Sequence, residues 1–265
     1  MVTELDVIQV VDYVLGNLKK DENVVMNLYS FATLSSITYN CISSGCLRSD
    51  LSANEIRKLT LTRIAKLSTL SEQKRKEIEN MFREIKGALK KSGYKVAEIE
   101  ITTKSRTIAG VSSSFLYELT EVGIYFDWVL NLPFIPGSEI KGVVRAGIND
   151  PELEEMIFGG EEKGISKVGF TDAYPIDPVG SYTLIPDVMT PHYQGAKNEL
   201  EVKPRPIFFL TVPPNVTFKF LMYHREDDLG SMVCRRIPLI IASGLGAKTS
   251  VGYSYFKLKE MVYNA

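Results

Sequence analysis

The chain of 265 residues has few cysteines and histidines, no long apolar run and no excess of either charge. Its three cysteines, an odd number, make no disulfide framework, and Cys41 and Cys46 have no second ligand pair to complete a zinc site. Proline, glycine or charged residues interrupt the apolar runs, and the N-terminus lacks the basic-then-apolar order of a signal peptide. We therefore expect a globular cytoplasmic protein with no membrane span, no metal and no other cofactor.

The balance of charges limits the partners of the chain. Lysine and arginine number 31 and aspartate and glutamate 32, which gives a formal net charge of −1 at pH 7. A free-standing nucleic-acid binder usually carries a basic excess. Any contact with nucleic acid is therefore expected to be local, or shared with partner proteins. The 45% of hydrophobic residues can fill the core of one large domain, or of one domain with a helical annex.

The first third of the sequence has helical periodicity, which predicts four helices. Ser52 and Glu55 form a capping-box pattern ahead of the third helix, and Gly93 ends the fourth. The fourth helix carries lysines and arginines interleaved with glutamates on its outer face, which is either a solvated face or a surface for RNA or another subunit. The apolar residues at helical spacing are Ile8, Val11, Leu15 and Leu18; Leu28, Phe31 and Leu34; Ile56, Leu59 and Ile64; and Ile78, Met81, Phe82, Ile85 and Leu89.

At Tyr94 the helical period gives way to the alternation of a strand, so we place a boundary near residue 92. The prediction is a helical N-terminal region over 1–92 and a second region over 93–265. In the second region the elements follow the order β-(β)-α-β-β-β-α-β, which is two βαβ halves of an α+β, ferredoxin-like or RRM-like sheet. The expected strands are 98–102, 122–126, 168–173, 207–212, 216–223 and one that ends near 258, with 207–223 as a hairpin; the expected helices are 138–147, 151–158 and 227–243. Residues 175–206 have no clear period and are predicted to form a long inserted loop.

Two stretches have residues suited to an anionic ligand. In LPFIPGSEIKGVVR the prolines end an apolar run, Ser138 is placed to cap a helix, and Lys141 and Arg145 share one face of it. A helix N-terminus with free N–H groups, a hydroxyl and two cations suits a phosphate; the alternative is an ordinary serine cap and two solvated cations. In GLGAKTSVGY the pattern is not that of a P-loop, because Ala247 precedes the lysine and a strand follows.

Four segments taken in order, IPGSEIKGVVR, KVGFTDAYP, DVMTPHY and GLGAKTSVGY, resemble the RAMP superfamily of CRISPR ribonucleoproteins. The resemblance covers roughly residues 95–258, and DVMTPHY is similar to the Cmr (type III-B) subunits conventionally counted sixth. It implies a ferredoxin-like RAMP fold with a thumb-like loop, in an antiviral effector complex. The implied role is non-catalytic: the subunit holds the CRISPR RNA near its 3′ end, supports binding of the target RNA, and lies beside the repeated backbone subunit and other Cmr subunits.

The resemblance also implies which residues contact RNA. The phosphate-binding positions carried over are Ser138, Lys141 and Arg145 at the first helix and Lys248, Thr249 and Ser250 in the glycine-rich loop. Ser254 departs from the glycine that often follows the last tyrosine in this family. In the inserted loop, Met189, His192 and Tyr193 would insert between bases, with Lys197 on phosphate. A surface loop packed on its own domain or on a neighbour is the equal alternative, and a metal site on Asp187 and His192 lacks a third ligand.

A RAMP-type, metal-independent endoribonuclease that processes CRISPR RNA is the main alternative function. Such cleavage needs a base and an acid, and the only two histidines, His192 and His224, lie outside the IPGS and glycine-rich motifs. We interpret His224 as a structural surface histidine and Asp172 as a turn-forming aspartate. The RRM aromatic signature is absent, so the sheet face is not expected to stack bases. A third hypothesis is a purely structural adaptor whose helical region docks on a neighbour.

Overall fold

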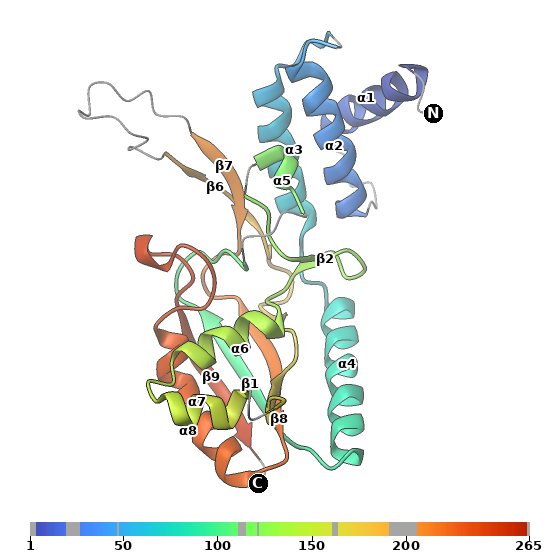
Figure 1. The fold of residues 1–265 in the computed structure, drawn as a ribbon. Coiled ribbons are helices and arrows are strands. Elements are labelled where there is room, and N and C mark those ends of the chain that lie inside the picture. The colour runs from blue at the N-terminus through green and yellow to red at the C-terminus, as the bar shows by residue number, and fades with distance from the viewer. Residues whose placement is uncertain are drawn as a thin grey trace, which may run out of the picture.

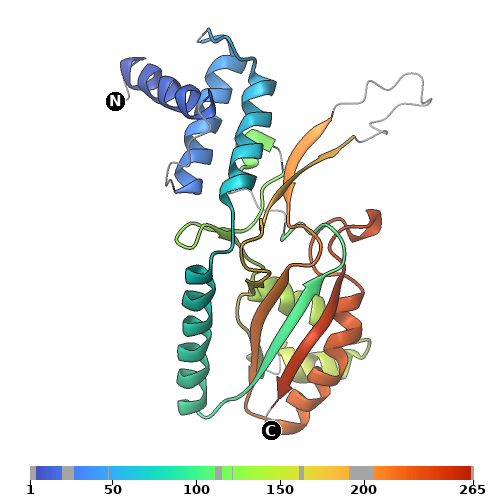
Figure 2. The same cartoon turned by 180° about the vertical axis from the view of Figure 1, so that it is seen from behind.

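The computed structural model describes residues 4–19, 27–46, 48–110, 115–120, 122–160, 164–190 and 206–263. A helical part lies at one end of the molecule and a sheet covered by helices at the other, and a β-hairpin projects between them (Figures 1 and 2). The N-terminal helices are α1 (Glu4–Lys19), α2 (Leu28–Ser43), α3 (Ala53–Leu67) and α4 (Glu72–Lys91). Among the helices that the structure describes, none has the length and apolar content that a membrane span requires.

The predicted N-terminal helices are confirmed, and local caps explain their ends. Ser52 accepts from the backbone N–H of Glu55, and the Glu55 carboxylate accepts from that of Ser52, so the capping box is complete. Ser71 caps α4 in the same way, through the N–H of Lys74. Gly93, at φ 79°, turns the chain out of α4 in a conformation that glycine adopts at little cost.

The main sheet has the ferredoxin-like order. It contains β1 (Lys95–Thr103), β4 (Val168–Phe170), β8 (Thr217–His224) and β9 (Phe256–Tyr263) in the order β4-β8-β1-β9, and β5 (Tyr174–Asp177) also pairs with β8. Helix α6 (Gly137–Ala146) connects β1 to β4, and α8 (Asp227–Ala242) connects β8 to β9. Because β8 lies between β1 and β4, the first half is a split βαβ unit, which confirms the predicted fold.

Both faces of the sheet are covered at least in part. On one face Ile99 and Phe220 share a core with residues of α6 and α8. On the other, Ile78 and Phe82 of α4 pack against the sheet in a second, smaller core that also contains Leu221. The fourth helix therefore packs on the sheet, although it belongs to the predicted N-terminal region over 1–92. The division of the chain into regions 1–92 and 93–265 stays a proposal. Helix α4 covers part of the sheet face that this fold can leave open.

The predicted hairpin over 207–223 is wrong. Strand β7 (Ile207–Thr211) pairs with β6 (Ile185–Met189) in a separate two-stranded sheet, whereas β8 joins the main sheet. The segment between β7 and β8 docks instead on the end of β1: Thr103 Oγ1 donates to the Pro213 carbonyl at 2.8 Å, and the N–H of Asn215 donates to the Thr103 carbonyl. The two prolines before Asn215 carry no N–H group, so they cannot supply the ladder bonds of a tight hairpin.

Other predicted elements differ in length. The strand expected over 122–126 is reduced to β2 (Phe126–Asp127), paired with β3 (Leu132–Pro133), and isolated bridges. The strand expected over 168–173 divides into β4 and β5, and the inserted loop over 175–206 contains β6 and most of β5. Two short helices complete the fold: α5 (Tyr117–Thr120) and α7 (Pro151–Phe158), the latter with the predicted proline in its first turn.

Candidate nucleic-acid interface

The N-terminus of α6 is capped by a carboxylate from another part of the chain. Ser138 makes no capping hydrogen bond, so its predicted role as the N-cap is wrong; Pro136 occupies the cap position. The backbone N–H of Gly137 donates to Asp172 Oδ1 at 2.7 Å, and the N–H groups of Glu139 and Ile140 donate to the Pro136 carbonyl. Three of the N–H groups expected to be free therefore have acceptors within the protein, and the Asp172 carboxylate already lies at the positive end of the helix.

The two cations of α6 contact α7. The Lys141 ammonium lies 5.8 Å from the centroid of the Phe158 ring, and Arg145 Nε lies 2.6 Å from Glu154 Oε1. Arg145 is exposed and Lys141 half-buried. Exposed ion pairs of this kind contribute at most about 1 kcal/mol, so both side chains can exchange their present partners for a phosphate at low cost.

The glycine-rich loop is held in shape by its backbone. Gly244, Gly246 and Gly252 have φ between 94° and 125°, and a Cβ at Gly246 would lie 2.6 Å from the Ile108 carbonyl. Lys248 is also left-handed, at φ 61°, and precedes a short 3₁₀ turn, η2 (Thr249–Val251). The loop therefore needs glycine for a close approach to the segment after β1 and places the three predicted RNA-contacting residues from 248 to 250 at its turn.

Ser254 fastens the base of this loop. It is fully buried with φ 62°, donates from Oγ to the Ala247 carbonyl at 2.8 Å and accepts from the N–H of Ile108 at 3.2 Å. A glycine at this position would make neither bond. The departure from the family pattern thus adds two hydrogen bonds that close the loop.

The two predicted segments do meet. Ser138 and Glu139 at the start of α6 line a hollow of about 370 Å³ together with Gly246 and Ala247 of the loop and with Gly110 and Tyr125. Burial raises the pKa of the Glu139 carboxyl to about 7, although a hydrogen bond from the backbone N–H of Gly110 lowers it in part. Glu139 Oε2 has no hydrogen-bond partner among the described residues. A carboxyl group thus lines the hollow, and Lys141, Arg145 and Lys248 are not among its lining residues.

The β6–β7 hairpin is anchored at its base by Asp187. Its carboxylate lies 2.6 Å from Arg106 Nη1, accepts from the Tyr253 hydroxyl at 2.9 Å and accepts from the N–H of Val188 at 2.8 Å. Burial raises the pKa of the Tyr253 hydroxyl, and its hydrogen bond to the Asp187 carboxylate and the charge of that carboxylate raise it further. Asp187 therefore joins three segments. Because three groups already donate to its carboxylate, few lone pairs are left to bind a metal ion. Met189 ends β6 and packs partly on the core, whereas His192, Tyr193 and Lys197 lie outside the described residues.

Comparison with known proteins agrees with this arrangement. The family model described as the RAMP superfamily matches residues 100–257, which is more than half of the chain and contains both segments of the hollow. The chain belongs to the RAMP superfamily.

Two curated RAMP relatives and one solved structure are similar over longer stretches. A CRISPR system CMR subunit Cmr6 of Saccharolobus solfataricus is 44% identical over 188 residues, covering 70% of this chain and 66% of the relative. A Cmr6 subunit of Pyrococcus furiosus is 37% identical over 222 residues, covering 57% and 64%. These matches span less than two thirds of each relative's length. A chain in a cryo-EM structure of the Type III-B Cmr-beta bound to cognate target RNA matches with a TM-score of 0.80 and 34% identity, covering 97% of this chain and 98% of that one.

His224 of this RAMP protein does not lie at the described interface, and His192 is outside the described residues. His224 is fully buried at the end of β8, so its expected surface position is wrong. Its Nδ1 lies 3.0 Å from the Glu226 carbonyl, its ring faces Tyr263 at 5.6 Å, and a Cβ at Gly230 would collide with it. A ring packed in this way is structural and cannot reach an RNA hydroxyl.

Sequence reasoning missed three residues of this interface. Tyr253 and Glu139 stand in the quoted motifs but were given no role, and Arg106 was not singled out. Arg106 and Tyr253 acquire their roles from contacts with Asp187, which lies far from both in the sequence. The acidic residue in the first turn of α6 was visible in the sequence, but its burial depends on Gly110 and the tertiary fold.

Proposed function

We propose that this chain is a non-catalytic RNA-binding subunit of a type III-B CRISPR (Cmr) effector complex. It holds the CRISPR RNA near its 3′ end, supports target RNA binding in antiviral defence, and contacts other Cmr subunits, above all the repeated backbone RAMP subunit. The observation that carries the proposal is the match over nearly the whole chain to a component of a Cmr-beta structure with target RNA. A cytoplasmic location follows from the same assignment.

The geometry supports RNA binding through loops and helix ends rather than through the sheet. The glycine-rich loop and the start of α6 border one hollow, and α4 covers part of the remaining sheet face. Lys141, Arg145 and Lys248 supply cations around this region. With a net charge of −1, few phosphates are neutralised, so the isolated chain should bind RNA weakly and with a clear salt dependence.

The decisive experiment on assembly is purification of the chain from its native host. CRISPR RNA and other RAMP subunits should accompany it. Purification of the chain free of both would overturn the proposal.

A variant experiment tests the RNA surface. Replacing Lys141, Arg145 and Lys248 together by Ala should weaken binding about equally for different RNA sequences and reduce the salt slope by about 2, since each phosphate contact on a single strand contributes roughly 0.7. A matched control removes three exposed cations of α4, Lys76, Arg83 and Lys90. If the control lost affinity and the first variant did not, the RNA surface would lie on α4 instead.

Incubation with labelled repeat RNA distinguishes this function from an endoribonuclease. The intact chain alone should leave the RNA uncut. Specific, saturable cleavage that disappears in His192→Ala would contradict the non-catalytic role. His192 is the cleaner target, because the buried His224 also supports the fold.

A further inference from the structure

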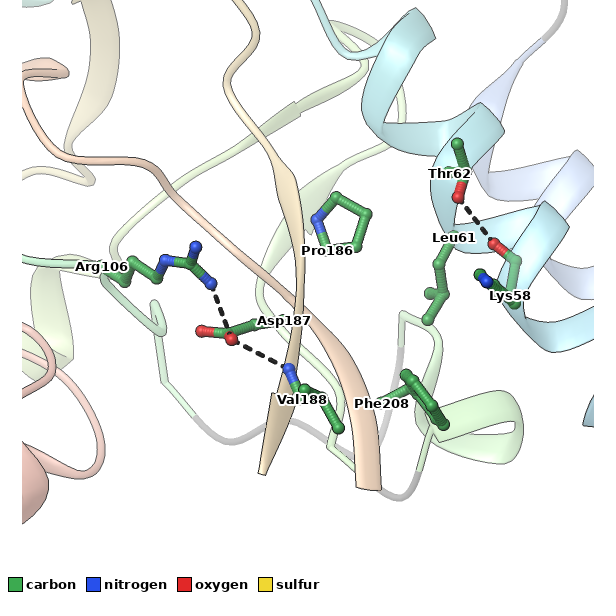
Figure 3. Close-up of a pocket in the computed structure, with 8 residues that line it drawn as sticks. All are labelled: Lys58, Leu61, Thr62, Arg106, Pro186, Asp187, Val188 and Phe208. Carbon is green, nitrogen blue, oxygen red and sulfur yellow. Dashed lines mark hydrogen bonds and ion pairs between the residues drawn. The ribbon is translucent and has the colours of Figure 1, made fainter. Parts of the chain in front are cut away.

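A pocket of about 390 Å³ lies between α3 and the base of the β6–β7 hairpin, outside the hollow beside the glycine-rich loop (Figure 3). This volume is within the range of small-molecule sites, about 300–1,000 Å³. Helix α3 contacts both strands of the hairpin, so the two walls are held together by packing. The helical N-terminal region thus contributes to a site that it shares with the start of the DVMTPHY segment.

The walls of the pocket are mainly apolar. Leu61 lines it from α3, and Pro186, Val188 and Phe208 line it from the hairpin. Leu61 is buried in the core, whereas the side chain of Val188 is 48% exposed. An exposed aliphatic side chain beside an aromatic ring leaves an apolar wall in contact with water. A flat apolar group would cover that wall favourably.

Two cations stand at this pocket, one from each side. Lys58 of α3 is exposed, and Arg106 is 46% exposed beside the hairpin. The Asp187 carboxylate is close by, but Arg106, the Val188 N–H and the Tyr253 hydroxyl all donate to it, so its charge is compensated. The guanidinium keeps further N–H donors for an anion.

This combination selects among ligands. A bare phosphate would leave the apolar wall in water, and an apolar peptide would offer no anionic group to Lys58 or to the remaining N–H donors of Arg106. A nucleotide supplies a planar base for the wall and a phosphate for the cations. The Tyr253–Asp187 hydrogen bond joins the pocket to the glycine-rich loop, so the two regions are adjacent in the fold.

We propose that this pocket binds one nucleotide of the RNA, with the base on Phe208 and Val188 and the phosphate on Lys58 and Arg106. The inference rests on the proposed RNA-binding function and extends it to α3.

Photo-crosslinking of the full chain tests the inference. A repeat-derived guide RNA and its complementary target each carry 4-thiouridine in turn, and the crosslinked peptides are identified by mass spectrometry. Crosslinks to Phe208 or to α3 from either strand support the pocket and identify the strand. Crosslinks confined to the glycine-rich loop overturn the pocket and leave the proposed function intact. If no RNA crosslinks to any part of the chain, both fail.

Affinity measurements on variants provide a second test. Lys58→Ala should reduce the salt slope by about 0.7, and Phe208→Leu should weaken binding about fivefold or more by removing the ring face. Lys76→Ala, an exposed lysine of α4, is the matched charge control. Thermal unfolding confirms that each variant is folded. Folded variants that bind RNA as the parent does would overturn the pocket.

Discussion

The buried carboxyl of Glu139 makes stability depend on pH in a direction that can be worked out. Its pKa is raised to about 7, against 4.5 for an unburied carboxyl, because burial disfavours the ionised form. Between pH 4.5 and 7 the folded chain therefore binds more protons at this site than the unfolded chain. Glu139 therefore makes its full contribution to the free energy of unfolding below pH 4.5, and this contribution is lost as the pH rises through 7.

The expected magnitude follows from the same shift. A displacement from 4.5 to about 7 corresponds to roughly 3 kcal/mol. Because the side chain is half-buried rather than fully buried, we expect about 2 kcal/mol to be measurable. Glu139→Gln keeps the shape of the protonated acid and cannot ionise. The variant should match the parent below pH 4.5 and exceed its stability by about 2 kcal/mol at pH 8.

Urea unfolding of parent and variant at several pH values measures this difference directly. Other groups titrate equally in both proteins, so only the difference between them reports on Glu139. Glu84→Gln, which removes the charge of an exposed glutamate of α4, is the matched control and should give a difference that does not vary with pH. A constant difference for Glu139→Gln as well would refute the assignment of a buried, destabilised carboxylate to this hollow.

Three further substitutions test the contacts that hold the interface. Tyr253→Phe keeps the ring and removes the hydrogen bond to Asp187, so the free energy of unfolding in urea should fall by about 1–2 kcal/mol. Amide exchange should become faster in the glycine-rich loop alone, and unchanged exchange there would argue against an anchoring role for this hydrogen bond. Phe82→Ala should lower the free energy of unfolding, measured by thermal unfolding, by about 3–5 kcal/mol because Phe82 is only 2% exposed. A decrease below about 1 kcal/mol would contradict a second core under α4. Asp172→Ala removes the acceptor of the Gly137 N–H and should lower the free energy of unfolding by about 1 kcal/mol. Asp172→Asn keeps an acceptor oxygen and should lower it less; the reverse order would refute the capping role of Asp172.

Features that depend on neighbouring residues were predictable from the sequence. The capping box at Ser52 and Glu55 spans three residues, and the glycine after α4 acts within its own turn. The alternation of β1 reflects a strand with different surroundings on its two faces. The order of helices and strands then sufficed for the ferredoxin-like fold, because few topologies accommodate two βαβ halves.

Features that depend on distant partners were not predictable. Ser138 has the residue type of a cap, yet the carboxylate of Asp172 reaches the helix from the other side of the βαβ crossover. The two strand-like runs around Pro213 resemble a hairpin locally, but each pairs with a strand from elsewhere. Pattern identifies an element, whereas its partner depends on long-range packing that a single sequence does not display.

The arrangement around Asp187 changes how the DVMTPHY segment is understood. The sequence predicted that Met189, His192 and Tyr193 insert between bases, with a packed surface loop as the equal alternative, and it assigned no partner to Asp187. In the structure, this aspartate binds Arg106 and Tyr253 within the protein. One carboxylate thereby fastens the hairpin base to the glycine-rich loop and to the segment after β1. A shift of the hairpin would move Asp187 and strain its hydrogen bond to Tyr253. A shift of the glycine-rich loop would strain the same hydrogen bond from the other side. RNA bound at the loop and RNA bound along the hairpin are therefore expected to influence each other through the Tyr253–Asp187 hydrogen bond.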